Sequence, residues 1–298
     1  MLLASPSGSG GAPGVTFPLM PLDSCSFGGV TLGKTDTNGV EWFFLDIDGW
    51  GAPQSSVSAV QRTSSDGAFV TPSFYQARVV TVSGAIFAPS RPQLIAARDQ
   101  LNGVGIQPIA LTVVEGGHSR YANAIRQSDI QYKETSDVSC EFTIQWICPD
   151  YRKFDSATQT AATGLPSSTG GLAVPFTVPF SIGSTITSGS CSLTNAGNVP
   201  GPVTCRFIGP LVGPQVTHTD AAGNLLVWGS SISLGSGDYL DVNMDDAAHT
   251  AILNGSVARD QYTTSRGWAM FTPGVNQWTL AAASGSGSLQ VTATAAYA

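Results

Sequence analysis

The sequence offers few residues whose type and spacing could do chemistry. Its three histidines are candidates for a general base. A histidine that activates a serine often accompanies a G-x-S-x-G turn, and the sequence contains no such motif. We therefore interpret His118, His218 and His249 as loop or strand-surface residues. We assign no catalytic, cofactor-binding or metal-ligating residue, and we expect a protein that is not an enzyme.

Two acidic patterns resemble parts of known sites, and neither is complete. Residues 241–246, DVNMDD, begin like a calcium-binding loop, but Asp246 stands where the loop requires Gly and Ile252 where it requires Glu. Asp46 and Asp48 resemble a glycosidase carboxylate pair, yet nothing around them would make one the acid and the other the base. In both segments polar and apolar residues alternate, which predicts half-exposed strands.

Three tryptophans of the C-terminal half, Trp228, Trp268 and Trp278, could form a platform for a sugar ring. Large aromatic side chains of a β-sandwich lie more often in its core, because they contribute most to the buried apolar area. Core packing is therefore the favoured interpretation of these residues, and sugar binding is kept as an alternative.

The five cysteines are spread along the chain without a C-x-x-C pair, which argues against a zinc site or a disulfide framework. Cys191 and Cys205 are equally distant from Asn198, so a hairpin turning at Asn198 would place them opposite each other. Two reduced, inward-facing side chains are the favoured interpretation. The sequence leaves open whether the pair is bonded.

The composition limits the classes of function. Charged residues make up only 11% of the chain and the formal net charge is −7, so direct nucleic-acid binding is not expected. Residues 1–16 lack the basic and apolar regions of a signal peptide and are expected to form a flexible arm. Residues 156–205 contain no charged residue, but they never give the run of about 18 apolar residues that membrane insertion needs. We expect a soluble protein made in a cytoplasm.

Strands account for most of the expected structure, because apolar residues recur at every second position. The segments with this alternation are 79–87, 109–114, 141–148, 240–244 and 289–297.

One segment, residues 90–103, has the period of an α-helix. Ser90 is a candidate N-cap, Pro92 falls in the first turn, and Gly103 is expected to stop the helix. The face expected in the core consists of Leu94, Ala97 and Leu101.

The composition changes near residue 155, where charged residues become rare. The segment that follows, ATQTAATGLPSSTGG, has low complexity and is interpreted as a linker. The expected organisation is a flexible arm at 1–16, an α+β domain at 17–155, a linker at 156–171 and a β-sandwich at 172–298.

The most distinctive residues lie at expected turns. Residues 194–203, TNAGNVPGPV, combine Asn, Gly and Pro in an order that predicts a hairpin. Asn254-Gly255 is a strong hairpin signal, and Pro273-Gly274 has the form of a type II turn in which Gly supplies the positive φ. All three turns are interpreted as structural.

The order of these segments resembles the distal tail protein family of long-tailed, non-contractile phages, often called Dit. The resemblance extends over nearly the whole chain. The segments that carry it are 41–53 (EWFFLDIDGWGAP), 64–86, 90–102, 120–126 (RYANAIR), 141–154 (EFTIQWICPDYRKF), 178–184 (VPFSIGS), 194–203 and 253–278.

The resemblance implies a mainly β protein with an N-terminal tail-tube-like belt domain, which carries one helix, and a C-terminal galectin-like β-sandwich. Members of the family form a ring of six subunits at the distal end of the tail. The ring joins the tail tube to the tail-tip or baseplate hub for host attachment and DNA delivery. The resemblance thus implies a structural virion protein, a homohexamer of the phage tail tip assembled in the bacterial host cytoplasm.

The partners implied by the resemblance are further copies of the chain, the tail tube protein, the tail-tip hub or tail-associated protein, the tape measure protein and receptor-binding proteins. No cofactor is implied. The galectin sugar signature, a His with an Asn-Pro-Arg set, is not visible, so no sugar-binding residue is carried over. A carbohydrate-binding β-sandwich adhesin of the tail tip remains the alternative.

Overall fold

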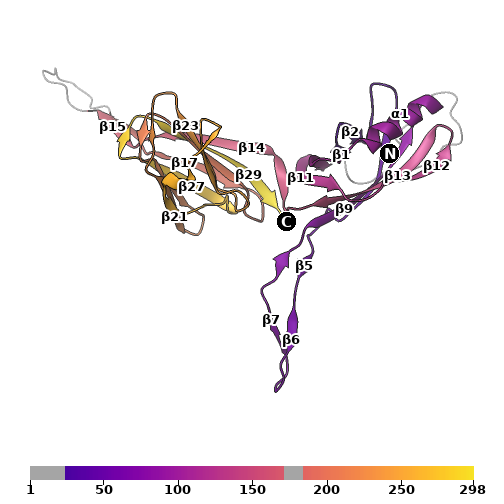
Figure 1. Ribbon diagram of the computed structural model, residues 1–298, viewed down its shortest axis with the longest axis horizontal. Coiled ribbons are helices and arrows are strands. Elements are labelled where there is room, and N and C mark those ends of the chain that lie inside the picture. The colour runs from indigo at the N-terminus through magenta and orange to yellow at the C-terminus, as the bar shows by residue number, and fades with distance from the viewer. Residues whose placement is uncertain (1–23, 171–183) are drawn as a thin grey trace, which may run out of the picture. The chain divides into compact units, whose positions relative to one another are not determined.

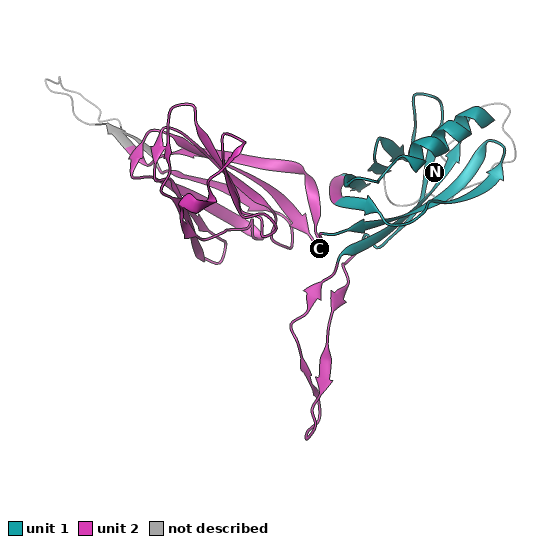
Figure 2. Ribbon diagram, in the orientation of Figure 1, with its two compact units in different colours: residues 1–50, 77–117, 123–149 teal, residues 51–76, 118–122, 150–298 magenta. Residues whose placement is uncertain are grey.

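The computed structural model of the chain describes residues 24–170 and 184–298, which fall into two compact units (Figure 2). Antiparallel strands dominate both units, so the predicted mainly β fold class is confirmed. The expected arm at residues 1–16 lies outside the described residues. Within the described part, no helix is both long and apolar enough to cross a bilayer. The first unit contains residues up to 50, 77–117 and 123–149, and the second contains residues 51–76, 118–122 and 150–298.

The first unit is built on one antiparallel sheet and a smaller group of strands (Figure 1). In the main sheet β13 pairs with β9, β9 with β4, and β4 with β3, while β12 and the end of β11 share the other edge of β13. Strand β1 pairs with both β2 and β10. The strands are β1 (Ser24–Phe27), β2 (Val30–Leu32), β3 (Lys34–Thr35), β4 (Glu41–Asp48), β9 (Arg78–Phe87), β10 (Ile109–Glu115), β11 (His118–Arg126), β12 (Gln131–Ser136) and β13 (Ser139–Cys148).

The alternation of apolar residues in β13 supplies much of the first unit's core. Phe142, Ile144 and Trp146 are at most 2% exposed, whereas the residues between them are half-buried. The Trp146 ring lies 5.2 Å from the Phe27 ring of β1. Full burial of such a side chain contributes about 1.5–3 kcal/mol, and a slip of β13 by one residue would turn all three to the opposite face of the sheet.

Helix α1 (Arg91–Asn102) forms where it was predicted, with Pro92 in its first turn, and it contacts β9 (Figure 1). Its buried residues are the predicted Leu94, Ala97 and Leu101. The helix begins after Ser90 and ends before Gly103 as predicted, but the interactions at its two ends differ from those expected. The Ser90 hydroxyl donates to the Gln93 side chain at 2.8 Å rather than capping a backbone N–H. Gly103 keeps a right-handed φ of −76°, because its N–H still bonds the carbonyl of Asp99.

The second unit contains a sandwich of two antiparallel sheets (Figure 1). One sheet has the order β25-β24-β23-β18-β29-β14, the other has the order β17-β27-β20-β21-β26, and the small sheets β22-β19-β28 and β15-β16 complete it. A 3₁₀ turn, η1 (Asp260–Tyr262), precedes β26. The strands are β14 (Lys153–Gly164), β15 (Ser167–Gly170), β16 (Ser184–Thr187), β17 (Ser190–Asn195), β18 (Val203–Ile208), β19 (Leu211–Val212), β20 (Gln215–Thr219), β21 (Leu225–Ser230), β22 (Ser233–Leu234), β23 (Tyr239–Asn243), β24 (Thr250–Leu253), β25 (Val257–Ala258), β26 (Thr263–Arg266), β27 (Gly274–Ala281), β28 (Ser284–Gly285) and β29 (Ser288–Tyr297).

The core of the sandwich is one cluster of side chains from both sheets. The rings of Phe207 on β18 and Trp228 on β21 stack with centroids 5.5 Å apart, and both side chains are fully buried. Leu240 and Val242 of β23 point into the same cluster, whereas Asp241 and Asn243 lie on the outer face. The alternation predicted for this strand is therefore confirmed.

The segment expected as a linker, residues 156–171, contributes most of strand β14 instead. Residues 158–164 pair with 288–294 of β29, which places β14 inside the sandwich sheet. Low complexity did not prevent this, because the run is rich in threonine, whose branched side chain suits a strand.

The hairpin predicted for residues 194–203 is absent from the structure. β17 ends at Asn195 and β18 begins at Val203, but the two strands belong to different sheets, so the segment between them crosses the sandwich. The Asn195 side chain holds this crossing by donating to the carbonyls of Val199 and Phe271 at 3.1 and 2.6 Å. Because their strands do not pair, Cys191 and Cys205 are not cross-strand partners, and both are free thiols in one core.

The other two predicted turns have the expected backbone. Asn254 and Gly255 have φ values of 50° and 71° and connect β24 to β25. Gly274 has a φ of 93° directly after Pro273.

Residues 51–76 form a two-stranded ribbon, here called the arm (Figure 1). Strand β5 (Ser55–Ser56) pairs with β8 (Phe74–Tyr75), and β6 (Ala59–Gln61) pairs with β7 (Ala68–Val70). Within the described residues no third strand joins either pair.

Candidate interaction surfaces

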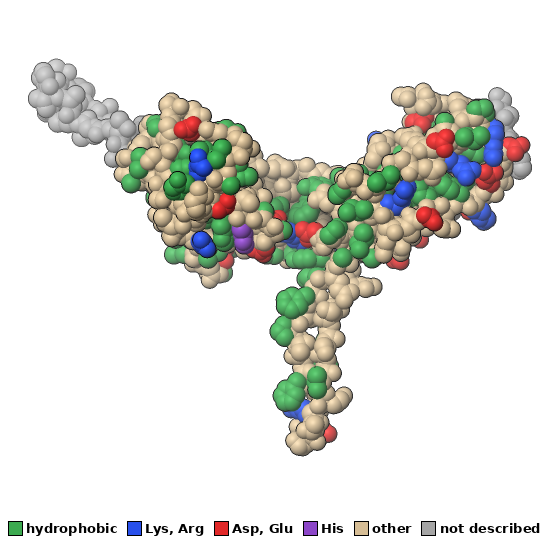
Figure 3. Space-filling view, viewed as in Figure 1, with side chains coloured by type: hydrophobic (Ala, Val, Ile, Leu, Met, Phe, Trp, Pro, Cys, Tyr) green, Lys and Arg blue, Asp and Glu red, His purple; other side chains and the backbone are tan. Residues whose placement is uncertain are grey.

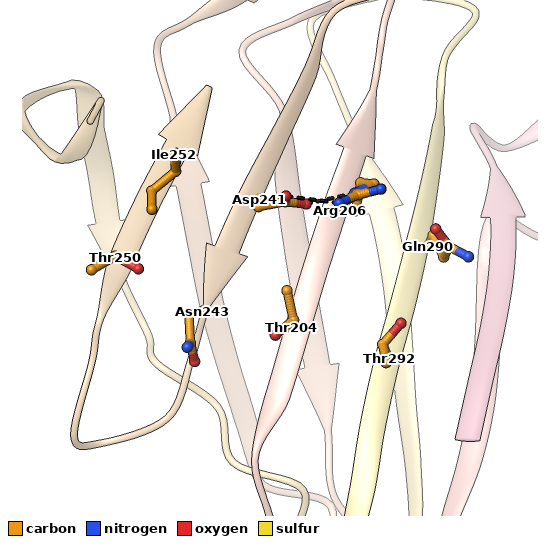
Figure 4. A pocket seen from close by; sticks show the side chains of 8 residues that line it. All are labelled: Thr204, Arg206, Asp241, Asn243, Thr250, Ile252, Gln290 and Thr292. Carbon is orange, nitrogen blue, oxygen red and sulfur yellow. Dashed lines mark hydrogen bonds and ion pairs between the residues drawn. The ribbon is translucent and has the colours of Figure 1, made fainter. Parts of the chain in front are cut away.

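A polar hollow lies on the outer face of the sandwich sheet, across β24, β23, β18 and β29 (Figure 4). Its volume is about 460 Å³, within the range of small-molecule sites. Although the lining residues point away from the core, all except Arg206 are only half-exposed, as expected for a concave surface. The lining residues are Thr204, Arg206, Asp241, Asn243, Thr250, Ile252, Gln290 and Thr292.

The strand register arranges these eight side chains in two parallel rows (Figure 4). The first row runs Ile252, Asp241, Arg206, Gln290. The second row runs Thr250, Asn243, Thr204, Thr292. Cross-strand partners share one face of a sheet, so the rows follow directly from the alternation of each strand.

Arg206 and Asp241 form a two-pronged ion pair within the hollow. Nε of Arg206 donates to Oδ1 of Asp241 at 2.6 Å, and Nη2 donates to Oδ2 at 2.9 Å. This hydrogen bonding raises the pKa of Arg206. The guanidinium also lies 4.5 Å from the centre of the Tyr239 ring. The pair is thus fixed in position and its charges cancel.

The arm is a second candidate surface because it exposes large apolar side chains that no layer within residues 24–170 and 184–298 covers. Figure 3 shows these side chains along the ribbon. Between 52% and 73% of each is accessible: Val57, Val60, Phe69, Val70, Phe74 and Tyr75. Arg62 and Asp66 are the arm's charged residues. Such a surface is typical of a contact with another protein.

The base of the arm is held to the start of β14. The Tyr75 and Tyr151 rings stack with centroids 4.7 Å apart, and Nζ of Lys153 donates to the carbonyl of Gly51 at 3.3 Å. These contacts order the ends of the ribbon while leaving the apolar side chains nearer its tip uncovered.

Each of the three histidines has its own structural environment. His118 is exposed. Nε2 of buried His218 lies 2.8 Å from Oδ1 of Asn276, and burial lowers the pKa of His218. The His249 ring stacks on Trp268 at 4.7 Å. The expected surface position is therefore wrong for His218, because its strand turns that residue toward the core.

The acidic patterns do not come together as a cation site. Asp46 and Asp48 are exposed on β4 and each accepts a hydrogen bond from the next backbone N–H. Asp245 pairs with Arg152 instead of joining Asp241. Among the described residues, no group of three His, Cys, Asp or Glu side chains could hold a metal ion.

The tryptophan platform is not formed. Trp228 and Trp278 are fully buried, and only Trp268 of the three is partly accessible. The interpretation of Trp228 and Trp278 as core residues is therefore confirmed. The cysteines are equally inaccessible, and burial raises the pKa of the Cys25 thiol to about 12. A thiol held protonated in this way is a poor nucleophile.

Neither candidate surface was identified from the sequence. The hollow depends on the register of four strands that are distant in the chain, and the sequence shows each strand's alternation but not which strands are neighbours. The sequence of the arm did contain a signal of an apolar surface, because residues 51–76 combine several apolar residues with only two charged ones. That signal is equally typical of a buried strand.

Comparison with known proteins gives matches among solved structures. No protein-family model and no curated protein sequence matches the chain. The structure is similar to SPP1 Dit (gp 19.1), described as a paradigm of the hub adsorption apparatus in phages that infect Gram-positive bacteria. The sequence identity is 13%, the match covers 92% of this chain and 99% of that one, and the TM-score is 0.64.

Chains of the phage P2 baseplate in its activated conformation also match. With Ca, the identity is 12%, the coverage is 85% of this chain and 90% of that one, and the TM-score is 0.48. With Sr, the corresponding values are 10%, 84%, 90% and 0.47. The likeness to SPP1 Dit confirms the predicted resemblance at the level of the fold.

Proposed function

We propose that the protein is a structural virion protein of a phage tail and has no enzymatic activity. In this proposal it forms a ring of six copies at the distal end of the tail, between the tail tube and the tail-tip hub. The observation that carries the proposal is the likeness to SPP1 Dit, which covers 92% of this chain and 99% of the other. A match of that extent involves both units rather than one common sandwich.

The arm supports the assembly part of the proposal. A lone two-stranded hairpin is at best marginally stable in water, and this one exposes 65% of Phe69 and 73% of Phe74. In a closed ring of identical subunits, each copy offers one surface and receives a different one. We assign the arm as the surface that each copy offers, and a neighbouring copy of the chain as its partner.

The remaining partners follow from the place of such a ring. The tail tube protein would lie on one side, and the tail-tip hub, the tape measure protein and receptor-binding proteins on the other. Assembly would take place in the cytoplasm of the bacterial host. An adhesin that binds sugar through stacked tryptophans is not proposed, because Trp228 and Trp278 are buried.

The assembly is tested by measuring the mass of the full chain in solution over a range of concentrations, by light scattering and native mass spectrometry. A ring requires a species of six times the 30.7 kDa of one chain, with six-fold symmetry in electron micrographs. Antibodies against the chain should label the distal end of tails in virions encoded by the same genome. A chain that stays monomeric and is absent from those virions would overturn the proposal.

The role of the arm is tested with matched variants. Phe69→Ser with Phe74→Ser should leave a folded monomer, because the side chains contribute to contacts between copies rather than to a core. Leu225→Ser changes an exposed apolar residue of the sandwich, where 64% of the side chain is accessible, and should leave the ring intact. If the arm variant still closes into rings, the arm is not the subunit contact.

A further inference from the structure

The polar hollow of the sandwich combines fixed hydrogen-bonding groups with zero net charge, and we propose that it binds a neutral saccharide. The inference concerns the eight residues of Figure 4. It does not depend on the proposed ring, because one sheet of one chain supplies every group.

Four of the lining side chains have hydrogen-bonding capacity that the described residues leave unused. Thr204, Thr250, Thr292 and Gln290 make no side-chain hydrogen bond to any residue in the described part of the chain. Each of these groups both donates and accepts. A ligand that satisfies them must itself donate and accept around its whole rim, which is the property of a ring of hydroxyl groups.

The ion pair and the threonines of the hollow are held in place before a ligand arrives. Two hydrogen bonds to Asp241 and the ring of Tyr239 fix the plane of the Arg206 guanidinium, and Nη1 makes no hydrogen bond to the described residues. The threonines are β-branched and therefore stiff at χ1. Preorganisation of this kind lowers the entropy that binding costs.

The charge of the hollow selects against anionic ligands. Among the described residues that line the hollow, Arg206 and Asp241 alone are charged, and they neutralise each other. A phosphate would have to compete with the Asp241 carboxylate for the Arg206 guanidinium, and a nucleic acid needs a basic groove with aromatic platforms. A peptide that adds as a strand needs a sheet edge, whereas the hollow lies on the face of four paired strands.

The dimensions suit a short oligosaccharide. Neighbouring strands lie about 4.8 Å apart, so the four strands span about 14 Å across each row. Thr160 and Ala162 of β14 continue the two rows beyond Thr292 and Gln290. Ile252 provides an apolar edge at the other end of the first row, where the C–H face of a sugar ring can pack.

The test is saturation-transfer NMR on the full chain with a panel of neutral saccharides at millimolar concentration. The panel contains mono- and disaccharides of glucose, galactose, mannose, rhamnose and N-acetylglucosamine, and glycerol 3-phosphate is the anionic comparison. We expect saturation transfer to at least one neutral saccharide and none to glycerol 3-phosphate. No signal from any saccharide, or a stronger signal from the anion, would overturn the proposal.

Variants locate the site. Arg206→Lys keeps the charge but loses the two-pronged geometry, and Thr204→Val with Gln290→Leu removes hydroxyl and amide groups from the hollow. Each should weaken saccharide binding about tenfold or more, the usual effect of losing hydrogen bonds that involve a charged or preorganised group. Arg266→Lys, on the other sheet, should bind as the unmodified chain does. Unchanged binding by the hollow variants would place the saccharide elsewhere and refute the inference.

Discussion

Arg152 donates from Nη2 to both carboxylate oxygens of Asp245, at 3.3 and 3.2 Å, across 93 positions of the chain. The same guanidinium donates to Asp150 at 2.7 Å and to the carbonyl of Pro200 at 3.2 Å. Burial disfavours its charge, but the two carboxylates outweigh burial and raise the pKa of Arg152. A single side chain therefore ties the start of β14 to two loops of the sandwich.

Replacing Arg152 with Met should lower the free energy of unfolding by about 2–4 kcal/mol, because it leaves two partly buried carboxylates without their cationic partner. Urea unfolding of the full chain measures the change. Arg206→Met is the matched control, since the Arg206–Asp241 pair is more exposed and such pairs contribute about 1 kcal/mol or less. Equal losses in the two variants would contradict the anchoring role of Arg152.

Gly84 of β9 lies opposite Phe142 of β13 and leaves room for its ring. A Cβ at position 84 would lie 2.5 Å from Cζ of Phe142 and 2.8 Å from the carbonyl oxygen of Phe43. Gly84→Ala should therefore destabilise the protein by about 1–3 kcal/mol through overpacking, seen as a lower Tm. Gly164→Ala has open space around the new methyl group and should change stability by about 0.5 kcal/mol or less.

Leu94 is fully buried beneath α1, whereas its neighbour Ile95 is 46% exposed. Leu94→Asp should unfold the first unit, because it buries a charge that has no partner. Ile95→Asp should leave the unit folded. Circular dichroism and limited proteolysis of the two variants distinguish them, and similar melting curves would mean that the helix face is misassigned.

Local patterns predicted the elements of the first unit well. The buried residues of β13 and α1 could be predicted because each segment by itself shows the hydrophobic period of a strand or of a helix. Turns that depend on the backbone conformation of one residue could be predicted equally well. Gly255, for example, has a positive φ of 71°.

Pairing between distant strands could not be predicted in the same way. Residues 194–203 have the composition of a hairpin, yet Asn195 uses its amide to hold a crossing between two sheets. Residues 158–164 look like a linker until β29 is known to lie beside them. The polar hollow could not be predicted for the same reason, because its two rows of side chains form only when β23, β18 and β29 pair side by side.

His218 gives the sandwich a pH dependence whose sign can be worked out. His218 is 3% exposed, and burial lowers the pKa of its ring below the ordinary value of about 6.5, while its hydrogen bond to Oδ1 of Asn276 opposes the shift only in part. Below about pH 6.5 His218 is protonated in the unfolded chain, whereas in the folded chain burial keeps it neutral to a lower pH. Stability is thus fully present above about pH 6.5 and is lost as the pH falls, by at most about 1.4 kcal/mol per pH unit.

The measurement is the free energy of unfolding between pH 7.5 and 5, a window in which carboxylates with lowered pKa, such as Asp220 and Asp238, stay ionised. His218→Gln should be less stable at neutral pH but should lose the part of the slope that His218 contributes. His118→Gln, at an exposed position, should keep the slope of the unmodified chain. If the slope of His218→Gln equals that of the unmodified chain, His218 does not titrate with folding and the buried pair with Asn276 does not govern the acid stability.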